Sequence, residues 1–185
     1  ITTYQSLFTQ NLQLVDEGQI RRVAEWMSQS DRVFVCGNGS SGIAAREFKL
    51  RFMRLGLLVE AFDDYLLMQM SAALAKPGTL LIGMSISGKT REILKSLRLA
   101  KEKGAQVVLI TSNTAKALEE EFAEVIHIAS DTWLDTGISI SPQFPPLVLT
   151  DILFSYYLHT DFPENTALHQ DTLPAMHPEE GEKKE

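Results

Sequence analysis

The sequence lacks the features that mark secreted, membrane-spanning and nucleic-acid-binding chains. Its single cysteine, Cys36, lies in the apolar run VFVCG, where we expect it to pack as a small hydrophobic side chain. One cysteine forms no internal disulfide, which favours a reducing, cytoplasmic setting. No apolar run approaches the roughly 18 residues of a membrane span, and the first residues, ITTYQSLFTQ, lack the pattern of a signal peptide. A net charge of −7 argues against a broad basic surface that would bind nucleic acid.

What the sequence does contain is a regular alternation of apolar and amphipathic segments. With 185 residues, of which 44% are hydrophobic and 22% charged, the chain is long enough for one domain with a sizeable core. Apolar residues at helical spacing and short β-branched runs predict the individual elements. We expect helices at 4–28, with a break near Gly18, and at 40–56, 63–76, 89–104, 114–123 and 141–162, and strands at 32–37, 57–62, 79–85, 105–112 and 124–130.

This alternation predicts an α/β fold, a three-layer α-β-α sandwich around a five-stranded parallel sheet. The crossovers should be right-handed, and sheets of this kind bind ligands at the carboxyl ends of their strands. We expect residues 1–165 to form the binding domain. Residues 166–185, which end in PEEGEKKE, are expected to form a partly disordered C-terminal tail.

Two hydroxyl-rich loops follow predicted strands and open predicted helices. The first is GNGSSG at residues 37–42, and the second is SISGKT at residues 85–90. Both place backbone N–H groups and hydroxyls at a helix N-terminus, an arrangement that binds anions. Ser40, Ser41 and Thr90 would each be explained as helix N-caps, but two caps need two hydroxyls and these loops hold five. The sequence therefore predicts an anion site at the carboxyl edge of the sheet.

Two nucleotide-binding motifs are close to these loops but do not fit them well. In the first loop Gly37 and Gly39 form a G-x-G, yet serines stand where a dinucleotide fingerprint usually has glycines. The stretch GMSISGKT does match the P-loop pattern, because Gly83 supplies its first glycine. Gly83, however, falls inside an apolar strand, and no later strand offers a clear aspartate for Mg²⁺. An NTPase is thus the weaker interpretation.

In this order, the two loops resemble those of the sugar isomerase (SIS) domain, whose S-x-S-G-x-T pattern is the most specific signal in the chain. The resemblance implies a five-stranded parallel sheet flanked by helices, similar to flavodoxin and Rossmann folds. It also implies that hydroxyl groups bind the phosphate of a phosphosugar, that Gly88 and Lys89 give backbone contacts to it, and that Asn38, with Gly39 beside it, faces the sugar. The hydroxyls would be those of Ser40, Ser41, Ser85, Ser87 and Thr90.

Within the SIS family, the stretches AAREFKLRFMRLG and DDYLLMQMSAALAKPGTLLIGMSISGKTREI resemble the effector domain of RpiR/MurR-type transcription regulators. Such regulators carry an N-terminal helix-turn-helix domain that contacts DNA, and a start at Ile1 is what an excised effector domain would have. The resemblance implies a phosphosugar sensor with no cofactor and no metal. Large apolar residues in FKLRFMRLGLL and FPPLVLTDILFSYYL exceed what one helix face needs, so we expect a homodimer or a higher oligomer.

The alternative is a SIS-type isomerase that interconverts an aldose and a ketose phosphate. Such an enzyme needs a carboxylate base and a group that opens the sugar ring, often histidine. No acid and base have an obvious reason to converge on the two loops, so no catalytic residue is assigned. The candidate bases are Glu47, Glu92 and Asp135, and the candidate acids are His127, His159 and His169. In SDTWLDTGISISPQF, Asp131 or Asp135 supplies the acid that many regulators have there, but their arginine is missing.

Overall fold

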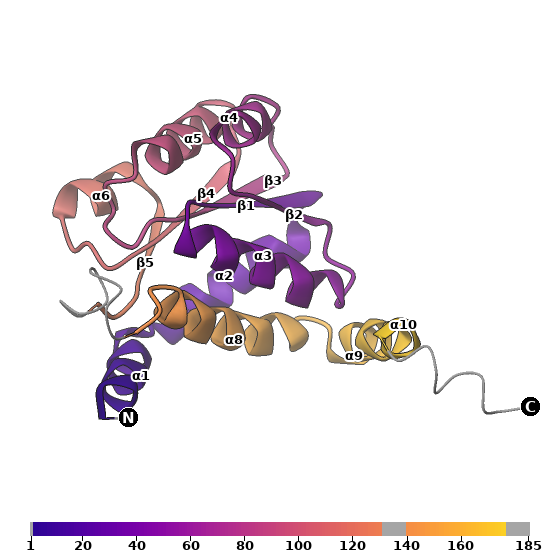
Figure 1. Ribbon diagram of the computed structural model, residues 1–185. Helices are drawn as coiled ribbons and strands as arrows, with labels where there is room; N and C mark the ends of the chain where they lie inside the picture. The colour runs from indigo at the N-terminus through magenta and orange to yellow at the C-terminus, as the bar shows by residue number, and fades with distance from the viewer. Residues whose placement is uncertain (1, 131–139, 177–185) are drawn as a thin grey trace, which may run out of the picture.

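The computed structural model of the protein describes residues 2–130 and 140–176, and it shows a parallel sheet between two layers of helices (Figure 1). The strands are β1 (Arg32–Gly37), β2 (Val59–Phe62), β3 (Thr79–Met84), β4 (Gln106–Thr111) and β5 (Glu124–His127). The helices are α1 (Thr2–Leu14), α2 (Glu17–Gln29), α3 (Ser40–Met53), α4 (Tyr65–Ala73), α5 (Arg91–Glu102), α6 (Lys116–Glu121), α8 (Phe144–Leu158), α9 (Phe162–Asp171) and α10 (Leu173–Met176).

The five strands pair in the order β2-β1-β3-β4-β5, and every pair is parallel. The predicted α/β fold with a five-stranded parallel sheet is therefore confirmed. The three central strands are apolar because both of their faces are covered, which is the rule for parallel sheets. Their carboxyl ends all lie at one edge of the sheet, and the two hydroxyl-rich loops begin there.

Helices cover the sheet on both sides (Figure 1). In that view α4, α5 and α6 lie above the sheet, and α2, α3 and α8 lie below it. The lower core contains the stacked rings of Phe48 and Phe52, whose centroids are 4.2 Å apart. Cys36 belongs to the upper core, where burial raises the pKa of its thiol to about 12, so it packs as the sequence predicts. No helix among residues 2–130 and 140–176 is long and apolar enough to span a bilayer.

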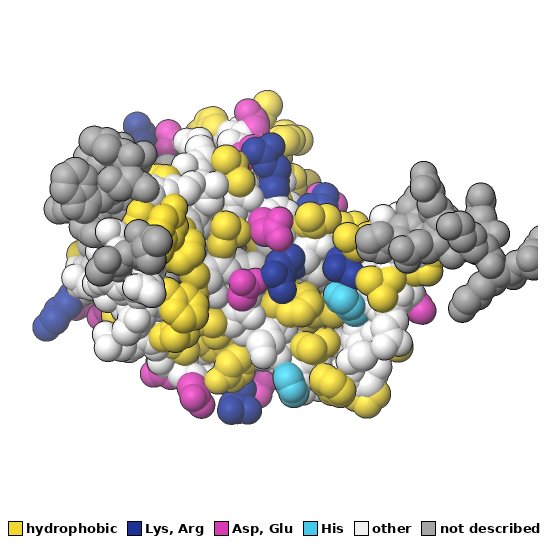
Figure 2. Space-filling model, turned by 60° about the horizontal axis from the view of Figure 1, so that its bottom comes forward, with side chains coloured by type: hydrophobic (Ala, Val, Ile, Leu, Met, Phe, Trp, Pro, Cys, Tyr) yellow, Lys and Arg dark blue, Asp and Glu magenta, His cyan; other side chains and the backbone are white. Residues whose placement is uncertain are grey.

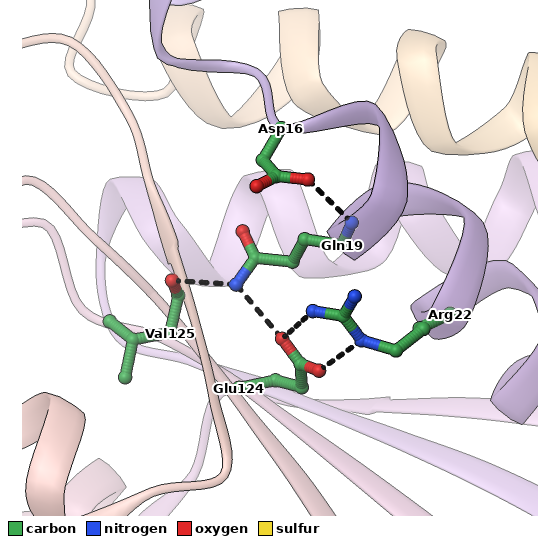
Figure 3. Close-up of polar contacts among 5 residues, drawn as sticks. All are labelled: Asp16, Gln19, Arg22, Glu124 and Val125. Carbon is green, nitrogen blue, oxygen red and sulfur yellow. Dashed lines mark hydrogen bonds and ion pairs between the residues drawn. The ribbon is translucent and has the colours of Figure 1, made fainter.

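Polar contacts fix α2 against β5 at the end of the sheet (Figure 3). Asp16 is the N-cap of α2, and its Oδ1 accepts a hydrogen bond from the backbone N–H of Gln19 at 2.9 Å. The Nε2 group of Gln19 donates to Glu124 at 2.9 Å and to the carbonyl of Val125 at 3.1 Å. Arg22 forms an ion pair with Glu124 at 2.8 Å, which neutralises a nearly buried carboxylate. These contacts explain why a carboxylate is tolerated at the start of a buried strand.

The structure differs from the sequence prediction mainly at the two ends of the chain. The break expected near Gly18 lies at Val15 and Asp16, because Asp16 caps a new helix there. The tail expected from residue 166 begins inside α9, so residues 166–176 are largely helical. Asn165 anchors α9 by donating to the carbonyl of Tyr157 at 3.0 Å. The boundary at residue 165 stays a prediction, and residues 177–185 lie outside the described part of the chain.

Candidate functional site

The register of the sheet brings the two hydroxyl-rich loops together. Gly37, the last residue of β1, pairs with Met84, the last residue of β3, and these two strands are neighbours. The first loop (residues 37–42) and the second loop (residues 85–90) therefore leave the sheet side by side. All nine residues that the sequence singles out for phosphosugar binding lie in these loops. They are Asn38, Gly39, Ser40, Ser41, Ser85, Ser87, Gly88, Lys89 and Thr90.

Glycines shape the first loop. A methyl group on Gly37 would lie 2.2 Å from the carbonyl oxygen of Ser41, so the chain folds back on itself at contact distance. Gly39 has a φ of 56° and serves as the N-cap of α3 without any side chain to cap it. The side chains of Asn38, Ser40 and Ser41 make no hydrogen bond to another described residue. Their polar groups remain available to a ligand.

Hydroxyl groups shape the second loop. The Oγ of the buried Ser85 accepts a hydrogen bond from the Thr90 N–H at 3.3 Å and donates to the Thr90 hydroxyl at 2.9 Å. The exposed Ser87 accepts from the Lys89 N–H at 3.2 Å. Ser87 and Thr90 thus act as acceptors within the loop, and each keeps its own hydroxyl proton to donate to an anion.

The last residue of β4 and the two residues that follow it, 111–113, hold the backbone of the second loop. The carbonyl of Ile86 accepts from the backbone N–H of Ser112 at 2.9 Å and from the hydroxyls of Thr111 and Ser112 at 3.1 and 2.7 Å. Asn113 donates through Nδ2 to the carbonyl of Ser87 at 2.9 Å. Sequence reasoning missed this support. The polar cluster TSN directly after a buried strand, at the same sheet edge, is the signal that could have revealed it.

Helix capping does not explain the loop hydroxyls. Thr90 occupies the N-cap position of α5, but its side chain makes no capping hydrogen bond to the first turn. Ser40 and Ser41 lie inside the first turn of α3, after its N-cap. The first N–H groups of both helices therefore have no side-chain cap from these residues, which suits an anion at the helix N-termini.

Two details of the second loop refine the sequence interpretation. The N–H of Gly88 donates to the carbonyl of Ser85 at 2.9 Å, so a phosphate would receive it only if that turn opened. Gly83 lies within β3, where an added methyl would be 2.7 Å from Ile93 and 2.9 Å from Leu97 of α5. This glycine allows a helix to pack closely on the sheet, which explains its presence without a P-loop.

Comparison with known proteins identifies the family. The model of the SIS domain matches residues 27–136, which is more than half of the chain. The chain belongs to the SIS domain family. The match includes both hydroxyl-rich loops and the sheet that positions them, so the predicted resemblance is confirmed.

Relatives of this SIS domain include regulators and an isomerase. The transcriptional regulator RpiR of Escherichia coli is 30% identical over 141 residues, covering 76% of this chain and 48% of the regulator. The 3-hexulose-6-phosphate isomerase of Mycobacterium gastri is 34% identical over 140 residues, covering 76% of this chain and 68% of the isomerase. The chain spans about half the length of the regulators that it matches.

A similar solved structure is the NanR protein of Vibrio vulnificus complexed with ManNAc-6P. It is 26% identical, with a TM-score of 0.87 over 96% of this chain and 67% of NanR. The sugar isomerase domain of an RpiR transcription factor from Sphaerobacter thermophilus has a TM-score of 0.82 at 20% identity, with 92% and 94% of the two chains covered. The second likeness shows that the fold is shared.

The candidate isomerase residues within the described ranges lie apart from one another. Glu92 is in the first turn of α5, and Glu47 lies on α3, where it lines a hollow beside α8. His127 ends β5, and its Nε2 lies 3.0 Å from Glu119. His159 caps the far end of α8, where its Nδ1 lies 2.7 Å from the Ser155 carbonyl. Asp131 and Asp135 lie outside the described residues.

His169 also lies far along the molecule from the loops, on α9. Burial first, and then the positive charges of Arg54 and Arg51, lower the pKa of His169. Its ring faces Phe154 of α8, with centroids 6.3 Å apart. His169 is therefore separate from the two loops, whereas the pair of His127 and Glu119 lies at the carboxyl end of β5, beside the strand β4 that supports the second loop.

An open hollow of about 510 Å³ lies beside the second loop. Its lining residues are Ser87, Lys89, Ser112, Asn113 and Thr114, all polar. A larger hollow of about 730 Å³ lies between α2 and α8, away from both loops, and includes Arg21, Tyr156 and His159. The hollow at the loops offers hydroxyl, amide and ammonium donors together, which is the donor set that a phosphate ester requires.

Proposed function

We propose that this SIS domain is the phosphosugar-binding sensor of a transcriptional regulator. The observation that carries the proposal is the juxtaposition of two loops with five hydroxyl groups at the N-termini of α3 and α5. A dianionic phosphate monoester matches this arrangement because N–H and O–H donors and both helix dipoles favour negative charge there.

The two loops would divide the work of binding. The hydroxyls of Ser87 and Thr90 donate to phosphate oxygens, while Ser85 holds Thr90 in place from below. Lys89, which lines the hollow beside Ser87, adds a positive charge. Asn38, Ser40 and Ser41 reach the ligand from the first loop, and their side chains are not engaged elsewhere in the described chain.

The relatives support regulation over catalysis. The aligned residues cover only about half of each matched regulator, and the NanR structure contains ManNAc-6P. In the proposed function, DNA is bound by a helix-turn-helix domain outside this chain, in the cytoplasm, and two copies of the sensor form a homodimer. Ligand occupancy alters DNA binding only through a different affinity for two arrangements of that dimer.

A contact between α1 and the second loop provides a route for that change. Leu7 of α1 is buried against Ala129 and Ile140, and Ile86 of the second loop packs against the same cluster. Asn11 of α1 accepts a hydrogen bond from the Ala129 N–H at 2.8 Å. A shift of the loop on ligand binding would therefore reach the first helix of the chain through this cluster of packed side chains.

The test is calorimetry with a panel of sugar phosphates that includes ManNAc-6P. Ser87→Ala together with Thr90→Ala should weaken binding of the active compound by roughly 100-fold or more, since each hydrogen bond to a charged group contributes about 1.5–3 kcal/mol. Ser155→Ala, at an exposed position on α8, is the control and should bind normally. Equal affinity for the double variant and the control would refute the assignment.

An isomerase is the second candidate, and the 34% identity to the Mycobacterium gastri enzyme favours it. NMR spectra of each sugar phosphate that binds, recorded in the presence of the protein, distinguish the two functions. A sensor binds the compound and leaves its spectrum unchanged, whereas an isomerase converts it. Conversion at a rate proportional to protein concentration, lost in Ser87→Ala/Thr90→Ala, would replace the sensor by the enzyme.

A further inference from the structure

The hollow of about 730 Å³ between α2 and α8 is separate from both hydroxyl-rich loops. Its lining residues on α2 recur every three or four positions along one side of the helix, and the others lie at the C-terminal end of α8. Because α2 ends just before β1 begins, the hollow lies toward the amino edge of the sheet, opposite the loops. Its volume is within the range of small-molecule sites.

The charges in this hollow are balanced. Arg21 and Glu25 lie one turn apart on α2, and neither forms an ion pair with another described residue. The guanidinium of Arg21 lies over the ring of Tyr156, 5.8 Å from its centroid. Figure 2 shows the lower face of the molecule, along which α8 runs, and side chains of both charges are interspersed there. A phosphate would therefore meet a carboxylate as well as a guanidinium, whereas Lys89 is the charged residue in the hollow at the loops.

Three polar groups in the wall of the hollow are acceptors. The hydroxyls of Ser28 and Thr160 each donate to the backbone carbonyl three residues earlier, at 2.9 and 2.8 Å, so they keep lone pairs and not protons for a ligand. The Nδ1 of His159 lies 2.7 Å from the Ser155 carbonyl, so the neutral ring carries its proton there and its Nε2 accepts. An ionised phosphate group only accepts, and it cannot bond to any of the three.

We propose that this hollow, called here the α2–α8 hollow, binds a neutral polyhydroxylated molecule, a sugar or sugar alcohol without a phosphate. Each hydroxyl of such a molecule both donates and accepts. It can therefore bond to the acceptors of Ser28, Thr160 and His159 and to the donors of Arg21 and Gln29. The tyrosine ring in the wall supplies apolar surface for the C–H groups of the sugar. This site goes beyond the proposed sensor function, whose ligand binds at the loops.

Helix α8 borders both sites. Its first residue, Phe144, packs against the cluster of Leu7, Ala129 and Ile140, which Ile86 of the second loop also contacts. Its last turn lines the α2–α8 hollow, about 22 Å away along a helix of 15 residues. A neutral sugar that prefers one position of α8 would change the affinity of the loops for the phosphosugar, and the phosphosugar would change the affinity for the sugar by the same factor.

Proton NMR of the His159 ring tests the hollow at constant pH. The probes are glucose, N-acetylmannosamine and sorbitol at millimolar concentration, with inorganic phosphate as the charged comparison. At least one of the three neutral compounds should shift the His159 ring signals in a saturable way, and phosphate should not. No saturable shift with any of the three would overturn the site, and a saturable shift with phosphate would overturn its preference for a neutral ligand.

A pair of double variants tests the wall. Ser28→Ala with Gln29→Ala removes an acceptor and a donor at exposed positions, and it should raise the Kd of the neutral sugar about tenfold or more. The matched control is Ser6→Ala with Gln10→Ala on α1, which removes the same two residue types from exposed positions where they bond to each other at 3.0 Å. Circular dichroism checks that both are folded. Equal Kd values for the two double variants would contradict the assignment.

Ser87→Ala with Thr90→Ala separates the two sites. It should weaken the phosphosugar, as described above, and leave binding of the neutral sugar unchanged. Loss of the neutral sugar in this variant would place that sugar at the loops and overturn the second site. Absence of phosphosugar binding by the wild type would overturn the sensor and leave the α2–α8 hollow standing.

Calorimetry of the active sugar phosphate, with and without saturating neutral sugar, tests the coupling through α8. The two affinities should differ by about fivefold or more. Equal affinities would overturn the coupling and leave the site standing.

Discussion

The two loops of the candidate site achieve their shapes by opposite means. The first loop is closed by what its residues lack: Gly37 has no side chain, and the carbonyl of Ser41 occupies the space that a methyl would need. The second loop is held by hydrogen bonds. Ser85 bonds to Thr90 within the loop, and residues Thr111, Ser112 and Asn113, outside it, bond to its backbone. Serine therefore has a different task in each loop.

This difference separates structural hydroxyls from binding hydroxyls. Ser85 is buried and bonded within its loop, so its removal affects the fold and the ligand together. Ser40 and Ser41 make no side-chain hydrogen bond within the described chain, so their removal should affect the ligand alone. A pattern of serines in a sequence does not distinguish these tasks, but stability and affinity measured together do.

The largest expected effect is that of Gly37→Ala, which tests whether the first loop needs close backbone contact at Gly37. The added methyl would lie 2.2 Å from Ser41 O and 2.8 Å from the backbone nitrogen of Gly42, so the backbone must move. We expect a loss of about 3 kcal/mol in the free energy of unfolding, measured by urea denaturation, together with loss of phosphosugar binding.

Gly39→Ala is the control for this prediction. Gly39 has a φ of 56° but no atom within 4 Å of an added methyl, so only backbone strain of about 1–2 kcal/mol is expected. Equal losses for the two variants would show that conformational freedom, and not close packing, closes the first loop.

Ser85→Ala has the next largest expected effect and challenges the second loop. It removes the acceptor of the Thr90 N–H and the donor to the Thr90 hydroxyl, so we expect a loss of about 1–2 kcal/mol in the free energy of unfolding. Ser40→Ala should change the free energy of unfolding by less than about 0.5 kcal/mol. Calorimetry should nevertheless show that Ser40→Ala weakens phosphosugar binding about tenfold.

The proposed difference between the loops would be wrong if Ser85→Ala and Ser40→Ala had the same effects on stability and affinity. A stability loss in Ser40→Ala as large as that in Ser85→Ala would mean that the first loop also depends on a hydroxyl bond. Unchanged affinity in Ser40→Ala would remove the first loop from the site.

The fold was predictable because local patterns and global architecture agree. The strand predicted at 32–37 matches β1, and the helix predicted at 63–76 contains α4, which Asp64 caps. Parallel strands are apolar along their whole length, so their periodicity is simple to recognise. The helices α9 and α10 were missed because each has a proline in its first turn, because α9 is polar and α10 has only four residues, and because α9 is fixed by tertiary contacts such as that of Asn165.

The site was predictable in its location but not in its internal bonding. Loops that follow neighbouring parallel strands must lie together, and the strand order decides which loops are neighbours. The sequence does not show that Ser85 faces Thr90, or that Gly88 donates its N–H to Ser85, because these bonds depend on the turn geometry. The support from Thr111–Asn113 requires β4 to lie beside β3, and this strand order is set by the tertiary structure.

The smallest expected effect is that of Asn113→Ala, which tests whether the second loop is held from outside. The variant removes the bond from Nδ2 to the Ser87 carbonyl and the bond from the Ala115 N–H to Oδ1. Both are solvent-exposed, so we expect a loss of only about 0.5–1 kcal/mol in the free energy of unfolding. Phosphosugar affinity should fall a few-fold, because Ser87 is less well fixed. Thr114→Ala, at an exposed neighbour that forms no side-chain hydrogen bond to the described residues, is the control and should have no effect on stability. If Asn113→Ala left affinity unchanged while lowering stability, the second loop would be positioned by its own hydroxyls, and β4 would contribute to the fold alone.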